Sequence, residues 1–147
     1  MSKLPCLLPW AFAAGGTFLT RAVLYATWAS RGPEVKDALH LDTVQMGLLV
    51  MLYPLGGLVG IFFAERLRKV FGSRVLTIAS FSISGLAMAV LAFTIPAGNV
   101  IWSAVLLLVM GLPMAIADFV SNFECTAVNS RSKHTLMPAL HSAFGIG

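Results

Sequence analysis

The sequence carries little charge and little cysteine. Asp, Glu, Lys and Arg make up 11% of its 147 residues, against about 25% in an ordinary soluble domain. The two cysteines, Cys6 and Cys125, lie near no second Cys or His at a metal-ligand spacing. We therefore expect neither a metal site nor a disulfide, and the shortage of charge argues against a soluble domain.

Patterns of the common enzymes are missing as well. The sequence shows no nucleophile–base set, no metal-ligand spacing and no phosphate-binding glycine loop. Its net charge of +4 comes from basic residues in short loops between apolar stretches, whereas a nucleic-acid surface would cluster them on a folded domain. We expect no enzymatic activity, no cofactor and no nucleic-acid partner.

What fills the chain instead is uncharged apolar sequence. A helix of about 20 residues, at about 1.5 Å each, crosses a hydrocarbon core of about 30 Å. Four stretches have this length: residues 7–29, 46–64, 75–95 and 100–120. A further helix is expected to begin at about residue 136. The sequence predicts an all-α membrane protein, a transmembrane helix bundle in a single membrane domain over residues 1–147.

Basic residues are distributed unequally between the loops, which predicts the orientation. With the N-terminus in the cytoplasm, Arg31 and Lys36 lie outside. The basic residues on the inner side are then Lys3, Arg66, Arg68, Lys69, Arg74, Arg131 and Lys133. Because cytoplasmic loops carry an excess of Lys and Arg, the N-terminus is predicted to be cytoplasmic.

The first span carries a polar and aromatic face. Thr17, Arg21, Tyr25 and Trp28 follow one another at spacings of four, four and three, which place them on one side of a helix. A charge near the bilayer centre costs about 2.5–3.5 kcal/mol on insertion scales. We interpret these four residues as lining a substrate cavity; for Arg21 a structural ion pair and snorkelling to the outer surface remain alternatives.

Asp118 is the second charge inside a predicted span, and it shares a helix face with Asn122. Counted from the expected inner ends of their spans, Arg21 and Asp118 differ in depth by roughly 18 Å, so we do not expect them to pair. Asp118 and Asn122 are candidates for an inner gate or for ion coupling. His141 is a third candidate, because histidine titrates near neutral pH.

Small residues and one basic loop complete the pattern. Gly56 and Gly60 in the second span form a G-x-x-x-G pattern that allows close helix packing, and the serine-rich third span is expected to be a packing helix. The loop after the second span carries Arg68, Gly72 and Arg74. We interpret it as the orientation signal and as a candidate ionic latch.

Taken in order along the chain, these features resemble a known family. The features are Arg21 to Trp28 with Arg31-Gly32-Pro33, the glycine-rich second span, Phe71-Gly72-Ser73-Arg74, Asp118-x-x-x-Asn122 and the segment from Leu136 to Gly147. They are similar to the N-terminal half of the major facilitator superfamily, in the bacterial branch near fucose-permease-like transporters. The latch loop departs from the superfamily pattern, because it has no acid between Arg68 and Gly72.

The resemblance implies twelve helices in two halves that rock about a central site, so this chain is interpreted as an N-terminal fragment. We expect secondary transport of a small polar solute, sugar-like or an organic anion, by alternating access in a bacterial inner membrane. Coupling to a proton or another ion is left open. The expected partners are the lipid bilayer, the solute and the remaining helices of a full-length transporter. The alternatives are a membrane anchor or assembly subunit without transport, and a four-helix multidrug exporter.

Overall fold

The computed structural model describes residues 4–131 and residue 142, and within them the side chains of residues 12–127, 129, 130 and 142. Its helices are α1 (Leu4–Ala29), α2 (Gly32–Ala38), α3 (Thr43–Phe71), α4 (Ser73–Thr94) and α5 (Val100–Arg131). The described residues contain no strand. The helix expected from about residue 136 and the candidate residue His141 lie outside the described part of the chain.

Each of the four predicted apolar stretches lies in one long helix, except that Ile95 falls just beyond the end of its helix. Three features differ from expectation. Helix α3 continues to Phe71, so Arg68, which was expected in a loop, lies on a helix. The short helix α2, with Pro33 in its first turn, was not predicted. Helix α5 continues to Arg131, whereas its span was expected to end at residue 120. The polar residues from Ser121 to Asn129 include neither glycine nor proline, so nothing in them breaks a helix.

Local chemistry explains where the long helices begin and end. Asp42 and Gln45 form a reciprocal capping box at the start of α3, in which the Gln45 backbone N–H donates to the Asp42 carboxylate at 2.8 Å. Gly72 separates α3 from α4 with a φ of 77°, a conformation that glycine adopts without steric cost. The Asn99 side chain accepts from the Trp102 backbone N–H at the start of α5.

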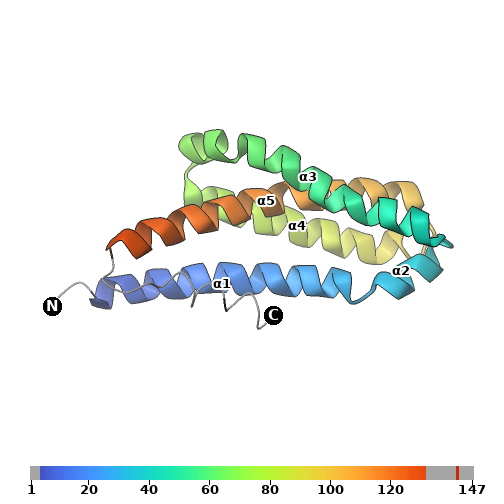
Figure 1. The fold of residues 1–147 in the computed structure, drawn as a ribbon, viewed down its shortest axis with the longest axis horizontal. Helices are drawn as coiled ribbons and strands as arrows, with labels where there is room; N and C mark the ends of the chain where they lie inside the picture. The colour runs from blue at the N-terminus through green and yellow to red at the C-terminus, as the bar shows by residue number, and fades with distance from the viewer. Residues whose placement is uncertain (1–3, 132–141, 143–147) are drawn as a thin grey trace.

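Helix α5 is the centre of the bundle. It packs most extensively against α3, then against α4 and, over a smaller contact, against α1. Figure 1 shows α1 running beside α5 along one edge of the bundle, with α3 on the opposite edge and α2 joining α1 to α3. The polar face predicted for α1 is therefore positioned by its packing on α5.

Glycines bring α3 and α5 into backbone contact. A Cβ added to Gly56 or Gly60 of α3 would overlap the carbonyl oxygen of Leu108 or Leu112 on α5. A Cβ on Gly111 would overlap the carbonyl oxygen of Tyr53 in the opposite direction. The close packing predicted from the G-x-x-x-G pattern is confirmed.

Serines perform the corresponding role between α4 and α5. Ser80 and Ser84 are buried, and the Ser84 hydroxyl lies 3.4 Å from the carbonyl oxygen of Met110 on α5. Small hydroxyl side chains permit close approach and satisfy their own polarity within lipid. The expectation that this serine-rich span is a packing helix is confirmed.

The outer surfaces of the long helices are apolar. Phe62, Phe93 and Ile101 are 86%, 78% and 76% exposed, which is costly in water and favourable in lipid. Among the described residues, three helical segments are long and apolar enough to cross a membrane: α3, α4 and Val100–Ala127 of α5. The protein is an all-α membrane helical bundle.

Candidate functional site

The two charges inside the predicted spans meet in the structure. The Arg21 guanidinium on α1 forms an ion pair with the Asp118 carboxylate on α5. The Arg21 side chain is 16% exposed and that of Asp118 is 46% exposed, so the carboxylate is the more accessible member. The guanidinium also lies over the Phe18 ring, 4.9 Å from its centroid, within the range of a cation–π contact.

This pair corrects the expectation that Arg21 and Asp118 lie at different depths. The depth of Asp118 was counted from an inner end at residue 120, but α5 extends to Arg131. Those 11 further residues add about 16 Å of helix at about 1.5 Å each, which accounts for most of the supposed offset. Asp118 therefore lies near the middle of α5 and level with Arg21.

Neighbouring polar groups support the pair on both helices. Asn122, one turn further along α5, donates from Nδ2 to the Asp118 carboxylate at 2.9 Å, and this confirms that the two residues share a face. On α1 the Thr17 hydroxyl accepts from the Ser121 hydroxyl at 3.1 Å. Thr17, Arg21, Asp118, Ser121 and Asn122 thus form one polar contact between α1 and α5.

Tyr25 lies one turn from Arg21 toward α2 and meets a residue that the sequence pattern did not single out. Its ring centroid lies 6.2 Å from that of Tyr53 on α3. Both tyrosines, together with Trp28 and Met46, line a cavity of about 410 Å³ between α1 and α3, which we call the tyrosine cavity. Tyr25 and Tyr53 are the only tyrosines in the sequence. This scarcity could have marked Tyr53 as a candidate site residue.

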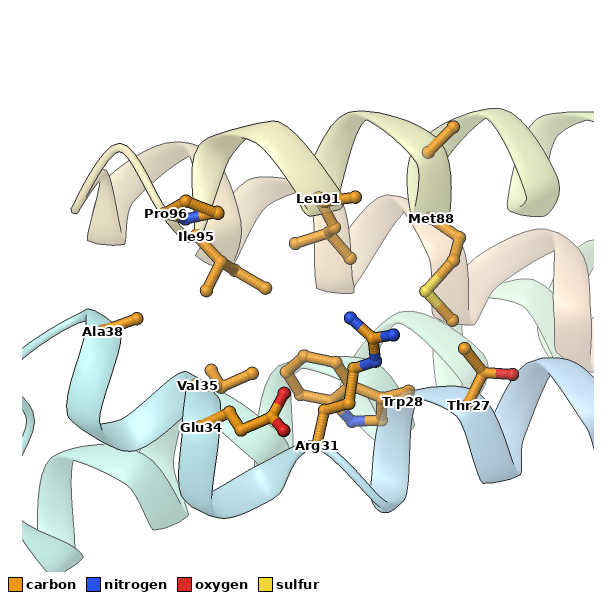
Figure 2. Close-up of a pocket in the computed structure, with 12 residues that line it drawn as sticks. Thr27, Trp28, Arg31, Glu34, Val35, Ala38, Met88, Leu91, Ile95 and Pro96 are labelled. Carbon is orange, nitrogen blue, oxygen red and sulfur yellow. The ribbon is translucent and has the colours of Figure 1, made fainter.

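Trp28 is mostly buried in the core of the bundle, and only part of its side chain reaches a cavity. It is 6% exposed and belongs to a core cluster with Val35, Leu49, Leu91 and Leu107. Figure 2 shows Trp28 and Arg31 on the α1–α2 side of a second cavity, facing Leu91 and Met88 of α4. This cavity has a volume of about 460 Å³. Trp28 thus packs the α2 end of the bundle and contributes one edge to each cavity.

Asn122 lines an open hollow on the surface of α5, on the side of the ion pair away from α2. Its volume is about 400 Å³, and Phe119, Phe123 and Thr126 of the same helix line it as well. We call it the Asn122 cavity. Along the antiparallel helices, the Arg21–Asp118 pair lies between Tyr25, which lines the tyrosine cavity, and Asn122, which lines this one.

The candidate latch residues make contacts of two kinds. Arg68 pairs at 3.3 Å with Glu65 of its own helix, which also pairs with Lys69 at 3.1 Å. Its guanidinium lies 3.8 Å from the centroid of the Phe123 ring on α5. Among the described residues, Arg68 pairs with an acid on its own helix, α3. An ionic latch would instead need an acid on a neighbouring helix.

Gly72 and Arg74 lie at the turn between α3 and α4. The Gly72 N–H donates to the Arg68 carbonyl at 2.9 Å, and this bond caps the C-terminal end of α3. Arg74 lines a cavity of about 740 Å³ with Ala14, Thr17 and Ser121. At its edge, the Ser73 hydroxyl donates to Glu124 of α5. Glu124 thus faces α4.

The chemistry that this arrangement offers is reversible, noncovalent binding. Within the described part of the chain, no three His, Cys, Asp or Glu side chains gather as a metal site would require. A guanidinium, a carboxylate, an amide, two hydroxyls and two phenols converge on the contact between α1, α3 and α5. Groups of these kinds form hydrogen bonds with polar ligands.

The fold and these contacts define the class as a helical membrane protein, and two relatives agree with it. The chain is 30% identical over 145 residues to the uncharacterized transporter y4wD of Sinorhizobium fredii (strain NBRC 101917 / NGR234), an alignment that covers 96% of the chain and 36% of the relative. It is 26% identical over 130 residues to the membrane protein MosC of Rhizobium meliloti, covering 88% of the chain and 31% of the relative.

The chain spans about a third of the length of these curated relatives. No family model matches the sequence. No solved structure is significantly similar to it.

Proposed function

We propose that the protein acts in secondary transport of a small polar solute across a bacterial inner membrane by alternating access. The observation that carries the proposal is the Arg21–Asp118 pair, a pair of charges inside an apolar helix bundle, with the tyrosine cavity on its α2 side. Intramembrane ionisable residues are costly and mark solute or ion pathways. One of the two relatives is itself named a transporter.

In this proposal each residue has a role that follows from its position in the bundle. Arg21 hydrogen-bonds the solute, and Tyr25 and Tyr53 supply the aromatic wall of its cavity. Asp118 and Asn122 form the inner gate, and Asp118 is the candidate for ion coupling. Trp28 holds the α2 end of the wall in place through its packing.

The sequence resemblance to the major facilitator superfamily, near fucose-permease-like transporters, supports the same mechanism. In such proteins substrates bind near the bilayer midplane and parts of the molecule rock around them. Further helices of a full-length transporter are the proposed partners of this bundle.

The test is uptake by the full-length protein with Arg21→Ala. Cells carrying the wild type are screened with radiolabelled sugars, polyols and organic acids, and the variant is then assayed with the solutes taken up. We expect uptake to fall by at least about tenfold, because a polar contact to the solute is lost. Arg66→Ala, at an exposed position near the C-terminal end of α3, is the control and should leave uptake unchanged. Normal uptake by Arg21→Ala would remove Arg21 from the mechanism.

A further inference from the structure

Pro54 interrupts the backbone hydrogen bonds of α3. Proline has no N–H, and its ring crowds the carbonyl four residues earlier in a helix. Because Pro54 lies inside α3, the Val50 carbonyl loses the donor that a regular helix would give it. Pro54 lies about 16 Å along α3 from Thr43, a depth at which lipid offers no donor. The carbonyl therefore needs a donor from within the protein or from a bound molecule.

This interruption lies on the wall of the tyrosine cavity. Val50 and Pro54, one helical turn apart, both line the cavity, as does Tyr53. The missing hydrogen bond would run between Val50 and Pro54, so the Val50 carbonyl borders the same space. Among the described residues that line the cavity, none is a serine or threonine, the side chains that commonly satisfy such a carbonyl in a membrane helix. The wall thus presents a backbone acceptor to whatever the cavity holds.

The packing of the bundle fixes the α3 side of the cavity. A Cβ added to Gly111 of α5 would overlap the Tyr53 carbonyl oxygen, so the backbone next to Pro54 lies directly against α5. The opposite wall is α1, with Tyr25 and Trp28. With the helices in these positions the cavity has a volume of about 410 Å³, and small-molecule sites occupy about 300–1,000 Å³. The space for a solute therefore exists without any separation of α1 from α5.

The lining suits a solute that has hydroxyl groups and an apolar face. A carbonyl accepts a hydrogen bond but cannot donate one, so the solute must present a donor to it. The aromatic rings of Tyr25, Trp28 and Tyr53 offer apolar surface. None of the described lining residues has a charged side chain. A sugar-like molecule provides hydroxyl donors and a face of C–H groups, whereas a carboxylate group has no donor for the carbonyl.

We propose, resting on the transport function above, that the Val50 carbonyl released by Pro54 is a solute-binding acceptor, which takes a hydrogen bond from a hydroxyl group of a sugar-like solute in the tyrosine cavity. Pro54 then exposes an acceptor besides bending the helix. Pro113 of α5 is a matched comparison, because it also lies inside a helix and releases the Val109 carbonyl. Neither Pro113 nor Val109 lines any of the cavities described above.

The experiment combines proline substitutions with solutes that lack one hydroxyl group. Full-length wild type, Pro54→Ala and Pro113→Ala are purified in detergent. Thermal-shift titration gives their dissociation constants for glucose, galactose, mannose and xylose and for the monodeoxy analogues of each sugar. We expect at least one sugar to bind the wild type, and one of its analogues to bind about tenfold more weakly because a hydrogen bond is lost.

The restored N–H of Pro54→Ala should occupy the Val50 carbonyl. This variant is expected to bind the parent sugar about tenfold more weakly than the wild type does, and to bind the deoxy analogue as well as the parent. Pro113→Ala should keep the wild-type constants. Pro54→Gly restores the same N–H with a lower helix propensity than alanine, so it should bind as Pro54→Ala does.

Wild-type binding by Pro54→Ala, or an equal loss on deoxygenation in both proteins, would overturn the proposal. A difference between Pro54→Ala and Pro54→Gly would assign the effect to helix stability and contradict the acceptor. Uptake into proteoliposomes is measured for the same proteins. The expected binding pattern without uptake would uphold the acceptor and contradict transport, whereas uptake without the effect of Pro54 would contradict the acceptor alone. Absence of binding and uptake for all four sugars would contradict both.

Discussion

At the scale of single residues, Arg21 and Asp118 show how an apolar bundle tolerates charge. The guanidinium lies against Phe18 and the carboxylate accepts from Asn122, so each group has a partner on its own helix besides the one opposite. Removing either member takes away the other's partner on the opposite helix. The two charges should therefore be energetically coupled.

A double-mutant cycle tests this coupling. Arg21→Met and Asp118→Asn, singly and together, are compared by the free energy of unfolding in mixed detergent micelles. We expect each single variant to lose about 1–3 kcal/mol, nearer the lower value because Asp118 is half-exposed, and the double variant to lose less than their sum. The control cycle, Glu65→Gln with Lys69→Met, involves an exposed pair and should show almost no coupling. Additive losses at Arg21 and Asp118 would mean that the pair does not form.

The polar face of α1 could be predicted from its four-residue spacing, but its neighbours could not. Thr17 bonds Ser121 and Tyr25 meets Tyr53, and these partners lie on helices whose rotation a single sequence does not fix. The pairing of Arg21 with Asp118 was missed because it depends on where α5 ends.

At the scale of helices, backbone contact through glycine determines how α3 meets α5. Gly56 and Gly60 on one helix and Gly111 on the other leave no room for a side chain. Such contacts are driven by van der Waals packing, because lipid provides no hydrophobic force between helices. The position of α5, and with it that of Asp118, depends on this interface.

Substitution of Gly60 by Ala should therefore destabilise the bundle. Its new methyl group would overlap the Leu112 carbonyl oxygen, and forcing such contact costs about 1–3 kcal/mol. The control is Gly85→Ala on α4, where nothing lies within 4 Å and alanine favours the helix by up to about 1 kcal/mol. Thermal melting in detergent compares the two. Equal melting temperatures for Gly60→Ala and Gly85→Ala would contradict the close packing.

The sequence predicted the long helices better than their boundaries. Hydropathy identifies apolar residues, so it located the membrane stretches but ended the last one at residue 120, where the polar residues begin. Helix α5 continues to Arg131 because the polar segment contains no helix breaker. Helix α2 was missed because seven residues are too few to show a helical period.

At the scale of the whole molecule, charge predicts which end of the bundle faces the cytoplasm. The basic residues at the end of α3 and the start of α4 lie at one end of the bundle. Arg31 and Lys36 lie at the opposite end, at α2. If the N-terminus is cytoplasmic, the tyrosine cavity lies toward the outside and the Asn122 cavity toward the inside. The orientation therefore determines which side loads the proposed site.

Cysteine labelling checks the orientation. In a background with Cys6→Ser and Cys125→Ala, Lys36→Cys should react with a membrane-impermeant maleimide in intact cells, since Lys36 is predicted to lie outside. Arg66→Cys should react only after the membrane is permeabilised. The reverse pattern would show that the N-terminus lies outside the cell. The tyrosine cavity would then lie toward the cytoplasm and the Asn122 cavity toward the outside.

The account depends most directly on α1 lying against α5, level with Asp118, inside the membrane. The Thr17 and Ser121 hydroxyls lie 3.1 Å apart, one turn from the ion pair, so cysteines at these positions are expected to be within reach of a disulfide. Oxidation of Thr17→Cys with Ser121→Cys in native membranes, in the same Cys6→Ser and Cys125→Ala background, should cross-link α1 to α5. The control pair of Thr27→Cys with Ser121→Cys, about 15 Å further along α1, should not react. Failure of the first pair, or equal cross-linking of both, would contradict the arrangement on which the proposed site rests.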